Sequence, residues 1–234
     1  MEFKVQDKNS QVLGSVVDNW SGANFPSKAT IVGQYCKLEV LSINDHAEAL
    51  FNAFSQDAEH RNWVYLPYGP FEKIADFKQW LQFITSGSDP MLYAIVDQQS
   101  NEAIGLAGYL SINPIHGVIE VGHVHFSPKL QNTPVATEAI FLLMQSVFDE
   151  LGYRRCEWKC NALNEKSKSA ALRFGFSFEG VFRQALVVKK RNRDTAWYSL
   201  LDSEWSNAKK RFELWLKPEN FDTKGKQKTK LQSI

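Results

Sequence analysis

Features that would place the chain outside the cell or in a membrane are scarce. The 234 residues include three cysteines, an odd number that argues against a disulfide framework. Cys156 and Cys160 lie four residues apart in a predicted strand, which separates their Cα atoms by about 13 Å, beyond the roughly 7 Å limit for a disulfide. No run reaches the roughly 18 apolar residues of a membrane span, and residues 1–30 contain no apolar signal-peptide core. We therefore expect a cytoplasmic protein with reduced cysteines and no membrane partner.

An excess of charge of one sign is missing as well. The chain has 27 Lys and Arg against 26 Asp and Glu, a formal net charge of +1, so no global field draws it to nucleic acid. Residues 205–234 are locally basic, with eight Lys or Arg and three acids. This end could favour an acidic partner or ribosomal RNA, but a solvated tail is the simpler interpretation. We expect no nucleic-acid partner, and both a monomer and a homodimer stay open.

The composition that remains is typical of a folded domain. Hydrophobic residues make up 44%, aromatic residues 13% and charged residues 23% of the chain, far from the composition of disordered proteins. The length fits one large α/β domain better than two small ones. The residues around the cysteines offer no metal-ligand spacing with histidine, so we expect no metal site.

Hydrophobic periodicity divides the chain into strands and helices. Residues 1–36 show only weak periodicity and are interpreted as an irregular extension packed over the domain. Beyond them, period-two and period-3.6 patterns are clear. They predict strands at 37–42, 92–96, 103–112, 118–126, 155–160, 180–188 and 195–201, and helices at about 45–54, 71–85, 135–151, 167–174 and 203–216. This order predicts a mixed sheet covered by helices, in the α/β or mixed α+β class.

Local signals predict where some of these elements begin, end and turn. Asn44 or Asp45 is expected to cap the first helix. Gly152 is expected to end the long helix after residue 151. The run 191–193 is expected to form the turn of a closing hairpin.

One strand-loop-helix unit could bind a phosphate group. The strand ending at Phe126 leads through a loop to Pro134 and then directly into the long helix. Such a unit directs backbone N–H groups and the positive end of a helix dipole at one spot, which suits a pyrophosphate. An ordinary connection between a strand and a helix would look the same.

Two blocks of sequence give this unit a more specific meaning. The run Gln131-Asn132-Thr133-Pro134-Val135-Ala136, continued by Thr137-Glu138-Ala139, resembles the coenzyme A loop of the GNAT acetyltransferase superfamily, Gln/Arg-x-x-Gly-x-Gly/Ala. The runs 155–167, 171–176 and 179–180 resemble the strand, Asn-x-x-Ser, short helix and Gly-Phe-x-x-Glu-Gly of its RimJ/RimL branch, which includes ribosomal-protein N-terminal acetylases. The likeness covers about residues 37–205 in order, and within the branch it points to an uncharacterised subgroup.

The resemblance implies a fold, a domain organisation and an activity. The GNAT fold is a mixed, mostly antiparallel sheet of six to seven strands, flanked by helices and splayed between its fourth and fifth strands. Residues 1–36 would form an N-terminal extension, 37–205 the acetyltransferase domain, and 206–234 a C-terminal helix and basic tail. The implied activity is acetyl-CoA-dependent N-acetylation, with direct transfer to the primary amine of a small molecule or a protein N-terminus. Two alternatives stay open, a non-catalytic acyl-CoA-binding module and a ribosome- or RNA-associated factor.

The resemblance also assigns residues to the cosubstrate, acetyl-CoA. The backbone amides near the end of the fourth strand are implied to meet the acetyl carbonyl; they belong to Val124, His125 and Phe126. The phosphates would be held by the loop and first helical turn, Gln131, Asn132, Thr133, Pro134, Val135, Ala136 and Thr137. Asn164 is implied to bond the pantetheine arm. The Ser167 hydroxyl is implied to reach the sulfur as a proton donor, although Ser167 could equally be a helix N-cap.

The loop departs from the family pattern at one position. Pro134 stands where the family usually has glycine, and proline has no N–H and a fixed φ, so one phosphate donor is absent. Proline is otherwise suited to the first turn of a helix. We expect coenzyme A to bind through the remaining amides, with lower affinity as one consequence of the proline.

The same comparison suggests which residues act on the amine. Glu120 is the best candidate for a general base, because family members often place a carboxylate in this strand. His123 and His125 are expected on the opposite face of the strand, where either could serve instead or simply pack as a polar residue. The residues Trp63, Tyr65, Tyr68 and Phe71 precede the second helix and are candidates for the wall of the acceptor site, or for covering the core.

Overall fold

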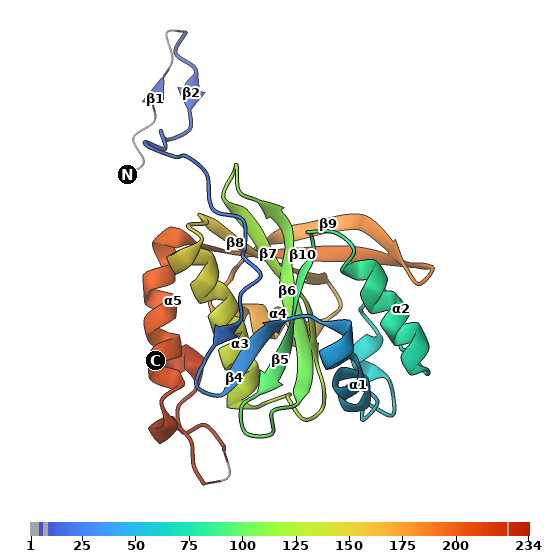
Figure 1. Ribbon diagram of the computed structural model, residues 1–234. Helices are drawn as coiled ribbons and strands as arrows, with labels where there is room; N and C mark the ends of the chain where they lie inside the picture. Colours follow the sequence, from blue (N-terminus) through green and yellow to red (C-terminus); the bar gives the residue numbers. More distant parts are fainter. Residues whose placement is uncertain (1–4, 7–8, 224) are drawn as a thin grey trace.

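The computed structural model describes residues 5–6, 9–223 and 225–234. Its centre is an open sheet of eight strands in the order β3-β4-β5-β6-β7-β8-β10-β9, with helices on both faces (Figure 1). The strands of this sheet are β3 Ile31–Val32, β4 Cys36–Val40, β5 Met91–Asp97, β6 Ala103–Asn113, β7 Val118–Phe126, β8 Arg155–Asn161, β9 Ser177–Val188 and β10 Arg191–Leu201. Neighbours are antiparallel except β7 and β8, which are parallel. The predicted mixed, mostly antiparallel sheet is confirmed. It has eight strands rather than the expected six to seven, because the two-residue β3 pairs with β4 at one edge.

The helices form two layers over this sheet. They are α1 Ile43–Phe54, η1 Arg61–Trp63, α2 Ile74–Ile84, α3 Pro134–Gln145 with a π-helical continuation η2 Ser146–Glu150, α4 Glu165–Phe174, α5 Asp202–Trp215, and the short turns η3 Pro218–Asn220 and η4 Leu231–Ser233. Helices α1 and α2 cover one face, where Leu92, Ala94 and Leu106 are buried. Helix α3 covers the other face, with Ile119 and Val121 of β7 in its core. Each strand of the centre therefore sends alternate residues into two separate cores.

Several helix starts differ from the sequence prediction, each for a visible reason. Helix α1 begins at Ile43 because the Ser42 hydroxyl accepts a hydrogen bond from the Asp45 amide, so Ser42 is the cap rather than Asn44 or Asp45. Helix α4 begins two residues earlier than predicted because Asn164 caps it. Ser167 therefore lies inside the first turn of α4 and is not its N-cap.

The closing hairpin turns at a different place from the one predicted. Val188 pairs with Arg191, so the turn consists of Lys189 and Lys190. Both have positive φ, 48° and 61°, as a two-residue hairpin turn of type I′ requires. The run 191–193 is the first part of β10 instead.

The N-terminal extension has two parts. The short strands β1 Val5–Gln6 and β2 Val12–Leu13 pair with each other and stand away from the body in Figure 1. The stretch after them lies against the body, where Trp20 Nε1 donates to the Ile115 carbonyl and the Asn24 amide to that of Leu151. The expected packing over the domain thus holds for the second part; residues 1–4 and 7–8 of the expected extension lie outside the described residues.

The basic C-terminal end folds back onto the protein. Leu231 is buried, and the side chain of Asn220 bonds to the backbone of Trp215 and Thr229. The prediction of a solvated tail is therefore wrong for its backbone, while described lysines such as Lys228 and Lys230 remain exposed.

Within the described ranges, no helix is long and apolar enough to cross a membrane. The same part of the chain has no group of three or more His, Cys, Asp or Glu residues placed to hold a metal ion. All three cysteines are free and buried, as expected.

Candidate functional site

Strands β7 and β8 pair along part of their length and then separate. Their parallel register runs through Val118 with Arg155 and Ile119 with Cys156, and it ends at Glu120 with Glu157. Further along, β7 stays paired with β6 and β8 with β10. The predicted splay is thus present, and Glu120 occupies the last paired position before it.

A β-bulge changes which side chains of β7 share a face. The register with β6 passes from Gly122 opposite Gly108 to His125 opposite Leu106, so two residues of β7 face one residue of β6. His123 takes a positive φ of 50° in this bulge. The alternation therefore shifts by one, and His125 lies on the same face as Glu120. The expectation that they occupy opposite faces is wrong.

Glu120 is a buried carboxylate held by two hydrogen-bonding groups. Its side chain is 12% exposed, and its Oε2 lies 2.9 Å from Lys159 Nζ. The Ser111 hydroxyl donates to the same oxygen at 3.3 Å. Burial raises the pKa of Glu120 above the usual value, and Lys159 opposes part of that rise. A carboxylate with a raised pKa is a stronger base than an exposed one, and its ion pair with Lys159 favours the ionised form.

Lys159 links Glu120 to a larger charge network. Its ammonium also lies 2.8 Å from Glu157 Oε2, and Arg155 Nε donates to the other oxygen of Glu157 at 2.8 Å. Burial lowers the pKa of Lys159, but the two carboxylates raise it by more. Sequence reasoning missed this lysine, although the alternation of Arg155, Glu157 and Lys159 along one strand face was a usable signal.

Both histidines of β7 are buried against aromatic side chains, which disfavours their protonated forms. The Nδ1 of His123 bonds to the Tyr68 hydroxyl at 2.8 Å, and burial lowers the pKa of His123 to about 4. The ring of His125 lies 4.0 Å from the rings of both Phe54 and Trp63, centroid to centroid. Burial lowers the pKa of His125 to about 3.

The N-terminus of α3 follows β7 at the open end of the splay. Thr133 caps it by accepting from the Ala136 amide, and Pro134 is the first helical residue. Gln131 Nε2 donates to the Phe126 carbonyl at 2.9 Å and so fixes the loop between β7 and α3. The Thr137 hydroxyl accepts from Arg173 Nη1 at 3.0 Å, which brings a cation from α4 to this end of the helix. The first amides of α3 and the Arg173 guanidinium both favour a bound anion here. The first amides of a helix have no partner within it and form its positive end.

Asn164 and Ser167 lie together at the start of α4. Asn164 Oδ1 accepts from the Ser167 amide at 3.1 Å. The Ser167 hydroxyl oxygen accepts from Trp158 Nε1 at 3.0 Å, and the hydroxyl also interacts with the Cys160 thiol, where it opposes the rise in the pKa of Cys160 that burial causes. Both residues follow the open half of β8, on the other side of the splay from α3.

The predicted aromatic wall bridges the same region. Tyr65 donates its hydroxyl proton to the Leu163 carbonyl at 3.1 Å, and Tyr68 contacts His123. Trp63 is buried against Phe71 and His125, and its carbonyl accepts from Lys189 at the tip of the β9–β10 hairpin at 2.8 Å. Tyr65 thus contacts the loop after β8 and Tyr68 contacts β7, while Tyr68 also packs, like Trp63 and Phe71, in the core under α1 and α2.

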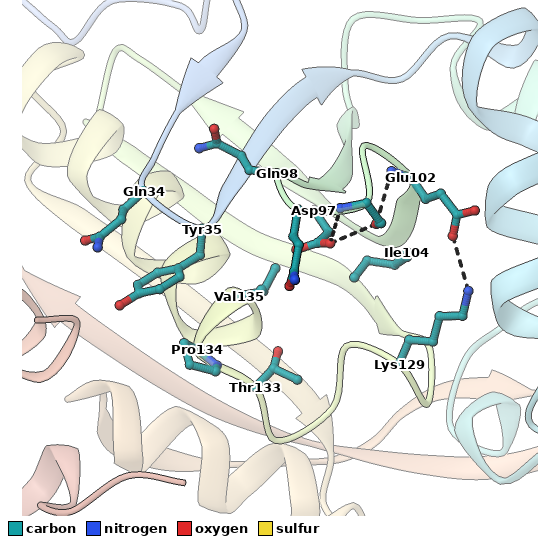
Figure 2. A pocket seen from close by; sticks show the side chains of 12 residues that line it. Gln34, Tyr35, Asp97, Gln98, Glu102, Ile104, Lys129, Thr133, Pro134 and Val135 are labelled. Carbon is teal, nitrogen blue, oxygen red and sulfur yellow. Dashed lines mark hydrogen bonds and ion pairs between the residues drawn. The ribbon is translucent and has the colours of Figure 1, made fainter. Parts of the chain in front are cut away.

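A cavity of about 520 Å³ lies beside the N-terminus of α3 (Figure 2). Thr133, Pro134 and Val135 form one side of it, and Asp97 and Glu102, at the turn between β5 and β6, lie across it from them. Lys129 pairs with Glu102 at its rim. Glu120 is not among its lining residues, so this cavity adjoins the loop before α3 rather than the Glu120 carboxylate.

The sequence matches the model of a known protein family over more than half of its length. The acetyltransferase (GNAT) domain model matches residues 38–177. The chain belongs to the GNAT acetyltransferase family. The predicted family and fold are thereby confirmed.

Three proteins illustrate the range of likeness. A GCN5-related N-acetyltransferase from Brucella melitensis is 44% identical, with 92% of this chain and 98% of that chain covered and a TM-score of 0.90. The ribosomal-protein-serine acetyltransferase of Escherichia coli (strain K12) is 27% identical over 107 residues, 45% of this chain and 59% of that protein. The microcin C7 self-immunity acetyltransferase MccE, solved in complex with acetyl-CoA and AMP, is 21% identical over 76% of this chain and 98% of its own, and its TM-score of 0.64 shows the shared fold alone. This GNAT protein is therefore an N-acetyltransferase by family, with a ribosomal-protein enzyme among its relatives.

Proposed function

We propose that this GNAT protein transfers an acetyl group from acetyl-CoA directly to a primary amine, with no covalent enzyme intermediate. The observation that carries the proposal is the position of Glu120. It is a buried carboxylate with a raised pKa at the last paired position of β7 and β8. A base at this point would meet an amine entering between the separated strands.

The open half of the site fits the cosubstrate. The amides of Thr133 and Val135 and the positive end of α3 suit its pyrophosphate, since the Ala136 amide already donates to Thr133 Oγ1 and Pro134 contributes no donor. Successive amides of a strand point to opposite edges, so those of Val124, His125 and Phe126 that face the splay rather than β6 would polarise the acetyl carbonyl. Asn164, at the start of α4, would bind the pantetheine amides through its free side-chain donor. Bound acetyl-CoA supplies an activated acyl group.

The remaining steps concern protons. The amine nitrogen forms a bond to the carbonyl carbon, the bond from carbon to sulfur breaks, and the amine proton passes to Glu120 directly or through a water. The leaving sulfur takes a proton from Ser167, whose oxygen already accepts from Trp158. Glu120 then gives its proton to solvent and Ser167 regains one from solvent, so both side chains return to their starting states and the products are an N-acetylated amine and free coenzyme A.

We further assign this reaction to residues 37–205, with 1–36 and 206–234 as accessory segments and Tyr65 and Tyr68 in the acceptor wall. The family match at 38–177 and the contacts of both tyrosines with the splayed region support this division. The acceptor is a small-molecule amine or a protein N-terminus.

Two measurements test the function. Acetyl-CoA should raise the melting temperature, because a ligand bound only by the folded state stabilises it by RT ln(1 + [L]/Kd), about 2.7 kcal/mol at a hundredfold excess over Kd. Release of free thiol should then be followed with a panel of amines. Thiol release that depends on an amine supports the transferase, and stabilisation without turnover would instead support an acyl-CoA-binding module. No thermal shift at millimolar acetyl-CoA would contradict both.

A further inference from the structure

The β9–β10 hairpin holds a half-buried guanidinium with no counter-ion beside the proposed site. Arg193 lies two residues before Thr195, which pairs with Asn161, the last residue of β8. Its Nε donates to Thr195 Oγ1 at 3.3 Å, which orients it on the strand face that also carries Lys159 and Trp197. Among all residues that the structure describes, no carboxylate forms an ion pair with Arg193.

A second arginine on the same sheet face shows what a satisfied guanidinium looks like. Arg155, at the paired end of β8, bonds to both Glu157 and Glu179. Arg193, at the splayed end, has only the Thr195 hydroxyl. Burial lowers the pKa of Arg193, and the charge of Glu120 is near enough to raise it in part. Arginine stays ionised in proteins, so the uncompensated charge is retained at an energetic cost.

A second unsatisfied donor lies on the same face of β10. The Nε1 atom of Trp197 is buried and has no hydrogen-bond partner in the described chain. Its ring lies 4.1 Å from Lys159 Nζ, the ammonium that also binds Glu120. Buried N–H groups are nearly always paired, so an unpaired one beside a reaction site points to a partner that arrives with the substrate.

The hairpin as a whole is basic where it overhangs the splay. Residues 181–194 contain five Lys or Arg and a single acid, Asp194. That acid is already used, since it accepts from the Gln184 amide and from Asn192. The hairpin tip reaches across to the Trp63 carbonyl through Lys189, so its positive field lies over the open end of β7 and β8.

We propose that the acceptor carries a carboxylate close to its amine, and that Arg193 and the Trp197 N–H bind this carboxylate while the amine faces Glu120. This inference rests on the proposed acetyl transfer and names its substrate class. A free amino acid and a peptide N-terminus followed by an acidic residue share this chemistry. Neither arginine nor indole N–H can accept a hydrogen bond, so the subsite selects acceptor groups that offer oxygen lone pairs and negative charge.

The experiment compares acceptors that differ only in that charge. Free amino acids are paired with their amides, and peptides beginning Ser-Asp with peptides beginning Ser-Asn, at saturating acetyl-CoA. We expect kcat/KM for the acidic member of the preferred pair to exceed that of its partner about tenfold or more, the loss typical of one charge-assisted hydrogen bond. The two pair types distinguish a small-molecule acceptor from a peptide.

Variants assign the effect to Arg193. Arg193→Gln should abolish the preference by raising the acceptor KM, with the KM for acetyl-CoA unchanged, and Arg193→Lys should restore part of it. Arg191→Gln removes the same charge from an exposed position on the same strand and should keep the preference. Equal use of both members by the wild type, or equal losses in the two Gln variants, would overturn the proposal. A rise in the acetyl-CoA KM would instead assign Arg193 to the coenzyme phosphates.

A binding measurement keeps this inference separate from the proposed function. With coenzyme A bound, the acidic member of a pair should raise the melting temperature of the wild type and of Glu120→Gln, but not that of Arg193→Gln. Thermal stabilisation without any turnover would contradict acetyl transfer and leave the carboxylate subsite standing. Turnover without any preference for the acidic member would support acetyl transfer and contradict the carboxylate subsite.

Discussion

The two halves of the β7–β8 pair differ in how fully their buried polar groups have partners. At the paired end, the described charged side chains on the open face, Glu120, Glu157 and Arg155, are joined in one ion network with Glu179 and with Lys159, which lies two residues beyond the last pair. In and beside the splayed half, buried polar atoms lack partners within the described residues: both ring nitrogens of His125, the Ser127 hydroxyl and Trp197 Nε1. At the paired end the Tyr153 hydroxyl is the corresponding atom without a partner among the described residues, so most such atoms lie in or beside the splayed half.

This difference in partnering suggests that one part of the strand pair serves stability and the other part serves ligand binding. Satisfied buried networks rigidify a fold and fix the protonation of their members. Unsatisfied buried groups cost free energy and are kept where a ligand or substrate repays it. The boundary between the two lies at Glu120, the residue we propose as the base. Substitutions in the ion network should therefore change stability and pH dependence. Substitutions in the splayed half should instead change ligand affinity.

The largest effect is expected at the boundary itself. Glu120→Gln keeps the size and hydrogen-bonding capacity of the side chain but removes the base. General base catalysis contributes about 10²- to 10⁴-fold, so we expect kcat at pH 7 to fall at least about a hundredfold in the thiol-release assay. The thermal shift with acetyl-CoA should match the wild type.

A wild-type rate for Glu120→Gln between pH 6 and 9 would contradict this role. An α-amine with a pKa of about 8 could then lose its proton to solvent before it reacts. The boundary between the two halves would in that case be structural only.

The ion network at the paired end is tested by removing Lys159, the cation that joins Glu120 to Glu157. Lys159→Met takes away the group that lowers the pKa of Glu120 against the effect of burial, so that pKa should rise further. More of the carboxyl would be protonated near pH 7, and the acid limb of the pH profile of kcat/KM should move to higher pH. Lys159→Arg should keep the limb near its wild-type position. An unshifted limb in Lys159→Met would show that the network does not set the protonation of Glu120.

The same variant carries a stability prediction with a definite sign. Breaking a buried ion pair by removing one partner costs about 3–5 kcal/mol, and the Lys159 and Glu120 side chains are only 14% and 12% exposed. A carboxyl whose folded pKa is raised favours folding only while it is protonated. The loss in unfolding free energy should therefore grow as the pH rises through the raised pKa of Glu120. Denaturant melts at pH 5 and pH 8 would measure it, with a larger deficit at pH 8.

Much of this arrangement could be predicted from the sequence. Period-two and period-3.6 patterns gave seven strands of the main sheet and the five main helices, because each strand or helix buries a continuous apolar face. Motif resemblance then identified the splay and the place of Glu120. The long helix was predicted to begin at residue 135, one residue after its observed start at Pro134, a position that suits proline.

The features that were missed depend on tertiary context. The bulge at His123 needs a positive φ in a residue other than glycine, which no local pattern announces. The Lys189-Lys190 turn lacks the usual Asn-Gly signal, and pairing across the hairpin determines it instead. The counter-ions of Lys159 come from two strands brought together only by the fold, so the ion network was invisible in any one segment.

A smaller, spectroscopic effect is expected for the histidines of the splayed half. Burial lowers the pKa values of His123 and His125 to about 4 and about 3. Both rings should therefore stay neutral, with NMR shifts that do not change between pH 5.5 and 8, while the exposed His60 provides a comparison signal. A midpoint near the ordinary value of about 6.5 for either ring would return that histidine to the list of candidate bases.

The smallest effect concerns Pro134, at the coenzyme end of the splayed half. Because Pro134 is the first residue of α3, its missing N–H would have had no partner within the helix and would have been free for a phosphate. Pro134→Gly restores that donor, a charge-assisted bond of roughly 1.5–3 kcal/mol. Against this, glycine loosens the unbound loop and removes a residue suited to the helix start, at about 1 kcal/mol.

The balance favours binding by about 1 kcal/mol, or roughly fivefold in Kd. Pro134→Gly should therefore bind coenzyme A modestly more tightly while its ligand-free form melts slightly lower. Matched calorimetric titrations and melting curves of both proteins measure the two terms separately. Weaker binding by the glycine variant would show that Thr133 and Pro134 already hold the loop in its binding conformation, and that the splayed half is as rigid at its coenzyme end as the paired half is at Glu157.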